Sequence, residues 1–195
     1  LNTMIRDTTV RAIFCARGGY GSVHLVDRVD LDTLSRQRKI LVGASDITVL
    51  LNYITAQTGL ITFHGPMVAT SFSKGMPGID HRSFQQALLK PSGMERWKPW
   101  EIALKRREVI RRGDASGRLV GGCLSLLVST LGSTYEFDGA NSILFIEDVN
   151  EPPYRVDRML KQLEDAGKIR GVRGVVIGDM LGCVDEKHPR WTIRE

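Results

Sequence analysis

Short apolar runs rich in β-branched residues alternate with segments of helical periodicity, and this alternation is what most restricts the fold of the chain. In the first third, residues 10–16, 39–44 and 60–67 each predict a buried strand, while 29–37 and 45–59 predict helices. Strands that alternate with helices form parallel βαβ units. The sequence therefore predicts an α/β fold, with the working residues at the carboxyl ends of the strands.

The composition changes after residue 72, and a second α/β unit follows a connecting segment. We predict an N-terminal domain over 1–72, a connecting arm over 73–117 that includes a short helix at 81–90, and a C-terminal domain over 118–195. The elements expected in the last domain are a strand or turn leading into a helix within 117–134, a strand at 142–149, a helix over 153–168 and a strand at 172–181.

Composition excludes several classes of function. The chain has 195 residues, 42% of them hydrophobic, and a net charge of +5. Much of the basic excess lies in 105–118, where no aromatic residues interleave it, so we expect a solvated face or a dock for an anionic substrate rather than a nucleic-acid site. No long apolar run or signal-peptide pattern is present, and we expect no membrane segment.

The cysteines are odd in number and widely spaced: Cys15, Cys123 and Cys183. This spacing fits neither a disulfide framework nor a zinc site, and it favours a reducing, cytoplasmic compartment.

The stretch RGGYGS, residues 17–22, follows the first predicted strand. It matches neither the GxGxxG dinucleotide fingerprint nor the phosphate-binding P-loop. Its glycines either let backbone N–H groups approach a ligand or form a tight turn that needs positive φ angles. The residues alone leave both interpretations open.

Ser45 stands between a predicted strand and a predicted helix, in the stretch GASD. A sharp strand-to-helix turn is typical of a nucleophile elbow, which exposes a serine hydroxyl beside an N–H group suited to bind an oxyanion. The usual GxSxG pattern lacks its last glycine here. The alternative is that Ser45 caps the helix and Asp46 complements the helix dipole.

Acidic residues end the predicted strand at 142–149. Alternation along a strand points Glu147 and Asp148 to opposite faces, so at most one of them faces a given cleft. The alternative for this corner is a helix start, with Glu151 near its N-terminus and Pro152 or Pro153 in its first turn.

A serine nucleophile requires a base, which is usually a histidine oriented by an acid. Of the four histidines, only His64 lies at the end of a predicted strand beside the expected active face. A histidine in that position is also compatible with a structural or substrate-contacting role, so the residues alone do not complete a triad.

Together, five segments resemble the LD-carboxypeptidases, the muramoyltetrapeptide carboxypeptidases of peptidoglycan recycling, to which the microcin-immunity peptidase is related. These segments are AIFCARGGYGSVHLVDRVD, KILVGASDITVLLNYI, GLITFHGPM, GGCLSLLVSTLGSTYEFD and ILFIEDVNEPPYRVDRMLKQLEDAG. The resemblance is weakest over the arm.

The resemblance implies a Ser–Glu–His peptidase with its active site between two domains. Ser45 would be the nucleophile, and Glu147 would orient the catalytic histidine. The N–H of Asp46 and an N–H from Gly18 or Gly19 would form the oxyanion hole. The substrate pocket would be bordered by Arg17, His64 and the stretch 121–123.

The chain departs from the family pattern in two places and at both ends. The family usually has an aromatic residue at the position of Ala44, and asparagine at that of Cys123. Family members also begin earlier and continue past Glu195, where their catalytic histidine lies. The resemblance therefore implies that both domains are incomplete here and that these 195 residues alone have little activity.

The implied reaction is hydrolysis of the amide between the L-centre of meso-diaminopimelate and the terminal D-Ala of a murein tetrapeptide. The family implies no metal or cofactor, a muropeptide substrate and a homodimer. Two alternatives remain: a microcin-immunity-type peptidase acting on a peptidyl-adenylate, with Trp97 or Trp100 stacking on the base, and an inactive muropeptide-binding module.

Overall fold

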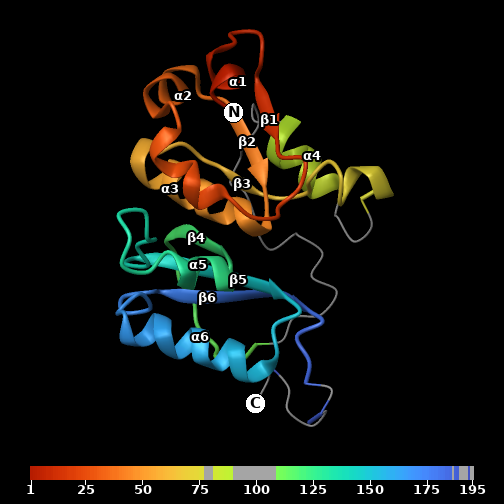
Figure 1. Cartoon of the computed structure of the whole chain (residues 1–195). Helices are drawn as coiled ribbons and strands as arrows, with labels where there is room; N and C mark the ends of the chain where they lie inside the picture. The colour runs from red at the N-terminus through yellow and green to blue at the C-terminus, as the bar shows by residue number, and fades with distance from the viewer. Residues whose placement is uncertain (77–80, 90–108, 186, 189–192, 194–195) are drawn as a thin grey trace.

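The computed structural model describes residues 1–76, 81–89, 109–185, 187–188 and 193. Two parallel three-stranded sheets form its framework, as the sequence predicts (Figure 1). The α/β class is therefore confirmed, and each sheet belongs to one of the two units.

The N-terminal sheet has the order β1-β2-β3. Its strands are β1 (Ala12–Phe14), β2 (Ile40–Gly43) and β3 (Phe63–His64). They lie within the predicted runs but are shorter. Three α-helices accompany them: α1 (Asn2–Arg6), which the sequence analysis did not predict, α2 (Leu31–Gln37) and α3 (Thr48–Thr58). Short 3₁₀-helices η1 (Ser22–His24), η2 (Val26–Arg28) and η3 (Ser45–Ile47) connect these elements.

Local sequence explains where the helices begin and end. The side chain of Asp30 caps α2 by accepting a hydrogen bond from the N–H of Thr33. Gly59 ends α3 in the left-handed conformation, with a φ of 70°. Leu50 and Ile54, one turn apart on α3, are buried against the sheet residues Ile13 and Leu41 in one core.

The second sheet has the order β4-β5-β6, formed by β4 (Arg118–Cys123), β5 (Ser142–Val149) and β6 (Gly174–Leu181). Two helices, α5 (Leu124–Ser129) and α6 (Pro153–Asp165), complete this unit. Leu124 and Leu163 are fully buried against Leu144 and Ile146 of the sheet. The register of β5 against β6 shifts between Ile146 and Asp148, next to Glu147.

The predicted arm lies mostly outside the described residues. Its described parts include η4 (Phe72–Lys74) and α4 (His81–Leu89), and α4 confirms the helix expected at 81–90. Edge-to-face and tilted contacts among Phe14, Phe72 and Phe84 attach this region to the N-terminal unit, with ring centroids 5.7–6.4 Å apart.

The two units meet along one side of the second sheet. Figure 1 shows this sheet between the N-terminal unit and α6, and α3 of the N-terminal unit contacts the end of β4. Within the described residues, no helix is long and apolar enough to cross a membrane.

Candidate active site

Ser45 lies at the carboxyl end of β2, in the turn that leads through η3 into α3. Its φ is 58°, in the left-handed region that L-residues rarely occupy. This strained strand-to-helix turn is the backbone geometry of a nucleophile elbow. The predicted alternative, a helix cap, is wrong: Ala44 occupies the cap position of η3 and Ile47 that of α3, and neither end has a side-chain cap.

The glycine turn packs directly against this elbow. A Cβ atom added at Gly18 would lie 2.8 Å from the Cβ of Ser45, 2.9 Å from its Oγ and 3.4 Å from the backbone N of Asp46. Only glycine fits this contact. The same approach places Gly18 beside the Ser45 hydroxyl and beside the N–H of Asp46, which the family resemblance assigns to the oxyanion hole, whereas a Cβ at Gly19 would meet nothing within 4 Å.

Asp46 holds the glycine turn in place. Its side chain is buried, at 5% exposure, and its Oδ2 accepts a 2.9 Å hydrogen bond from the N–H of Ser22. From the sequence, only a dipole or oxyanion role is expected for Asp46. The contact was missed because it joins two turns 24 residues apart.

Glu147 meets His64 across the two units. The distance from His64 Nε2 to Glu147 Oε1 is 3.5 Å, and the imidazole packs edge-on against Phe145 with ring centroids 5.2 Å apart. Burial lowers the pKa of His64 to about 4. Burial, followed by the charges of Asp148 and Asp179, raises the pKa of Glu147 to about 7. At neutral pH the imidazole is therefore neutral, and Glu147 is divided between its protonated and ionised forms.

Asp148 has a structural role away from this pair. Its Oδ2 accepts a 2.8 Å hydrogen bond from the N–H of Ser125, and the thiol of Cys123 lies 3.6 Å from its Oδ1. The side chains of Glu147 and Asp148 thus contact different residues, as expected because successive residues of a strand point to opposite faces.

The helix start expected after β5 is also present. Glu151 pairs with Arg155 at 3.0 Å, and α6 begins at Pro153 with Pro152 at its cap. This arrangement accounts for Glu151 without a catalytic role.

The surroundings of Cys123 disfavour its reactive thiolate form. It is buried, and burial is the main cause that raises its pKa to about 12. It and the other two cysteines are free. Among the described residues, no group of His, Cys, Asp and Glu could hold a metal ion.

The remaining candidate residues lie at the edge of the site or elsewhere. Arg17 is exposed in the glycine turn. His24 contacts the hydroxyl of Tyr20 at 3.0 Å, and His188 contacts Asp185 at the same distance, so both have partners away from Glu147. Trp97 and Trp100 lie outside the described residues.

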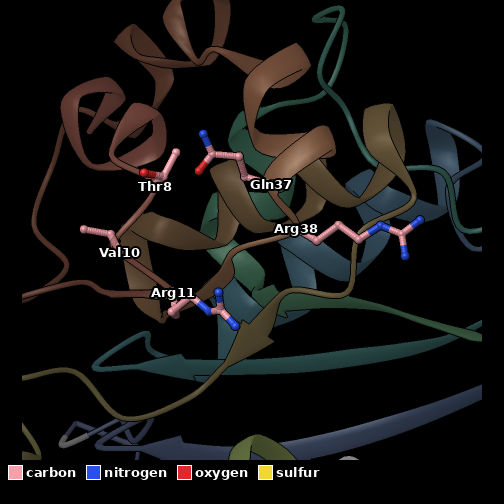
Figure 2. Close-up of a pocket in the computed structure, with 5 residues that line it drawn as sticks. All are labelled: Thr8, Val10, Arg11, Gln37 and Arg38. Carbon is pink, nitrogen blue, oxygen red and sulfur yellow. The ribbon is translucent and has the colours of Figure 1, made fainter.

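A separate hollow lies near the amino ends of β1 and β2, at the opposite end of the strands from Ser45. Figure 2 shows its lining, which comprises Thr8, Val10, Arg11, Gln37 and Arg38. None of the predicted site residues lines it.

Comparison with known proteins supports the same assignment for both units. Residues 1–65 match the LD-carboxypeptidase N-terminal domain, and residues 116–195 match the LD-carboxypeptidase C-terminal domain. The probable murein peptide carboxypeptidase of Bacillus subtilis is 39% identical over 191 residues, which cover 97% of this chain and 58% of that protein. The microcin C7 self-immunity protein MccF of Escherichia coli is 29% identical over 211 residues, which cover 95% of this chain and 61% of that protein.

Solved structures of related proteins support the same family assignment. The muramoyltetrapeptide carboxypeptidase from Oxalobacter formigenes superposes with a TM-score of 0.77 at 25% identity, covering 98% of this chain and 63% of that one. MccF in its wild-type apo state gives a TM-score of 0.80 at 26% identity, covering 99% of this chain and 64% of that one. The chain thus spans about three fifths of the length of these relatives. With both domain types matched in order and the fold shared, the chain belongs to the LD-carboxypeptidase family.

Proposed function

We propose that this protein is a serine carboxypeptidase that releases the terminal D-Ala of a murein tetrapeptide, with Ser45 as its nucleophile. The observation that carries the proposal is the left-handed backbone of Ser45, held at a strand-to-helix turn against Gly18. The name of the Bacillus subtilis relative, a probable murein peptide carboxypeptidase, supports the substrate class.

In the proposed reaction, Ser45 Oγ attacks the carbonyl of the L,D-amide. The N–H groups of Asp46 and Gly18 hold the oxyanion. The C–N bond then breaks, the amine of D-Ala leaves with a proton, and water hydrolyses the acyl-enzyme. The proposed base is a histidine that Glu147 orients; it takes the proton of Ser45 Oγ and passes it to the leaving amine. The free carboxylate of the substrate requires a cation, and the candidate is Arg17, which is exposed and directly precedes Gly18 in the glycine turn.

The test is D-alanine release from L-Ala-γ-D-Glu-meso-diaminopimelate-D-Ala. The assay uses the full-length protein, because these 195 residues alone are expected to have little activity. Wild type is compared with Ser45→Ala, and Ser116→Ala, at an exposed loop serine, is the matched control. Release by wild type and Ser116→Ala but not by Ser45→Ala is expected. Release that survives in Ser45→Ala would contradict the assigned nucleophile, and binding of the tetrapeptide without release would indicate a binding module.

One observation favours a second candidate, hydrolysis of a peptidyl-adenylate. MccF shares the fold of this chain with a TM-score of 0.80, and one MccF structure contains aspartyl sulfamoyl adenosine. An aspartyl-adenylate peptide assayed beside the tetrapeptide separates the two, because faster Ser45-dependent cleavage of either identifies the substrate class.

A further inference from the structure

Two side chains on α3 bind the edge of the second sheet. Thr48 Oγ1 accepts a 3.2 Å hydrogen bond from the N–H of Cys123. Asn52 Nδ2 donates a 2.7 Å hydrogen bond to the carbonyl of Gly121, and Asn52 Oδ1 accepts a 3.1 Å hydrogen bond from the N–H of the same glycine. Each contact joins residues about seventy positions apart, across the two units.

The spacing of these contacts matches the geometry of a helix packed beside a strand. Thr48 and Asn52 are four residues apart, which is about 6 Å along a helix. Cys123 and Gly121 are two residues apart, about 6.6 Å along a strand. Among the described strands β4 is an edge strand, so its outward N–H and C=O groups need partners. The amide of Asn52 pairs with both groups of Gly121, as a neighbouring strand would.

The sequence of β4 permits this close approach. A Cβ added at Gly122 would lie 2.7 Å from both Cγ2 and Oγ1 of Thr48. Gly121 and Gly122 also have φ angles of 131° and 135°, which L side chains rarely adopt. Thr48 itself is 1% exposed, so its hydrogen bond is shielded from water.

The contacts connect the two elements that carry the proposed catalytic groups. Thr48 follows Ser45 by three residues, in the turn that continues η3. Cys123 is the register partner of Glu147 in the ladder that pairs β4 with β5 over six residues. One hydrogen bond and one rung of a sheet therefore connect the turn that carries Ser45 with the strand that carries Glu147.

We propose that Thr48 and Asn52 are positioning residues, which set the distance between Ser45 and Glu147 for catalysis. This inference rests on the proposed function of both groups. Neither side chain touches the reacting atoms in this scheme. They act by fixing α3 to β4, which keeps Ser45 and Glu147 at a constant separation.

The experiment compares Thr48→Val and Asn52→Leu with wild type in the D-alanine release assay. Both changes keep the approximate volume and remove the hydrogen bonds. We expect kcat to fall by about 10- to 100-fold, since a displacement of about 1 Å can cost about 100-fold in rate. KM should change less than kcat, because neither side chain is itself placed in the substrate pocket, although both bind the stretch 121–123 at its border.

Two variants separate positioning from general stability. Thr55 lies on the same helix, and Thr55→Val removes its 2.9 Å hydrogen bond to Thr62, which stays within the N-terminal unit. This variant should leave kcat unchanged. Thr48→Ser keeps the accepting hydroxyl and should restore kcat. If Thr48→Val unfolds, Asn52→Asp, which keeps one acceptor and loses the donor, gives an intermediate change. Thermal unfolding of every variant verifies that the assayed protein is folded.

Labelling of Ser45 by a fluorophosphonate provides a readout that does not depend on the peptide. Slower labelling in Thr48→Val and Asn52→Leu than in Thr55→Val supports the inference. Wild-type labelling and kcat in both variants would overturn it while leaving the proposed nucleophile intact. A wild-type protein whose Ser45 neither labels nor releases D-alanine would instead overturn the proposed function, and the inference with it.

Discussion

His64 Nε2 lies 3.5 Å from Glu147 Oε1, so the last residue of β3 in one sheet meets the acid near the end of β5 in the other. Burial disfavours the charged form of each group and shifts the two pKa values in opposite directions, to about 4 for His64 and about 7 for Glu147. As the pH falls, protonation of His64 is therefore expected to lower the stability of the protein, and protonation of Glu147 is expected to raise it.

Glu147→Gln should flatten the dependence of stability on pH between pH 4.5 and about 7. Because the pKa of Glu147 is raised from 4.5 to about 7, the native state binds more protons than the unfolded state in that window. Its contribution is thus most favourable below pH 4.5 and is lost as the pH rises through 7. Urea denaturation at both ends of the window should show the variant gaining stability relative to wild type at the higher pH. Equal differences at both ends would contradict the raised pKa.

His64→Asn should reduce the loss of stability in acid. The pKa of His64 is lowered from 6.5 to about 4, so the unfolded state binds the proton more readily. The stabilising contribution is present above pH 6.5 and is lost as the pH falls through 4. The free energy of unfolding, measured on acidification, should fall less steeply in the variant than in wild type. Parallel curves would show that the imidazole keeps its ordinary pKa.

Ser45→Gly should be more stable than Ser45→Ala by about 1 kcal/mol. Both variants lack the hydroxyl, but only glycine adopts a φ of 58° without a steric cost, which is about 1–2 kcal/mol for other residues. Chemical denaturation of the pair isolates this strain, and neither variant should release D-alanine. If alanine proved as stable as glycine, the turn would not be left-handed in solution.

Gly18→Ala should abolish most activity. The added methyl group would lie 2.9 Å from Ser45 Oγ, so either the hydroxyl or the turn must move, with an expected loss of about 100-fold in kcat. Gly19→Ala is the control. Its methyl group would meet nothing within 4 Å, so kcat should fall less than in Gly18→Ala, whereas the φ of 122° at this position makes the substitution destabilising. Steady-state kinetics and thermal unfolding of both variants test this contrast. A greater loss of kcat in Gly19→Ala would contradict it.

Asp46→Ala should destabilise the protein by about 1–3 kcal/mol, because the buried N–H of Ser22 loses its acceptor. Asp46→Asn keeps an acceptor oxygen and should lose less. Asp27→Ala, at an exposed acid in η2, serves as the control for the loss of one charge. Urea denaturation ranks the three variants, and an Asp46→Ala variant as stable as Asp27→Ala would show that the contact with Ser22 contributes nothing.

Much of the fold could be predicted from local patterns. The apolar runs at 39–44 and 142–149 became β2 and β5, and Asp30 and Gly59 mark the ends of helices because capping depends on neighbouring residues. α1 was missed, as was the 3₁₀ turn before α3.

The candidate site likewise has features that the sequence predicts and features that it does not. The sequence by itself determined which residue types stand at the ends of strands, including Ser45 after β2 and Glu147 near the end of β5. The left-handed backbone of Ser45, the hold of Asp46 on Ser22 and the joining of α3 to β4 by Asn52 were decided only by the tertiary structure. Strand and helix periodicity depends on neighbouring residues and can be recognised in the sequence. The contacts of Asp46 and Asn52 join segments that are far apart in the chain, and local sequence does not indicate which groups will meet.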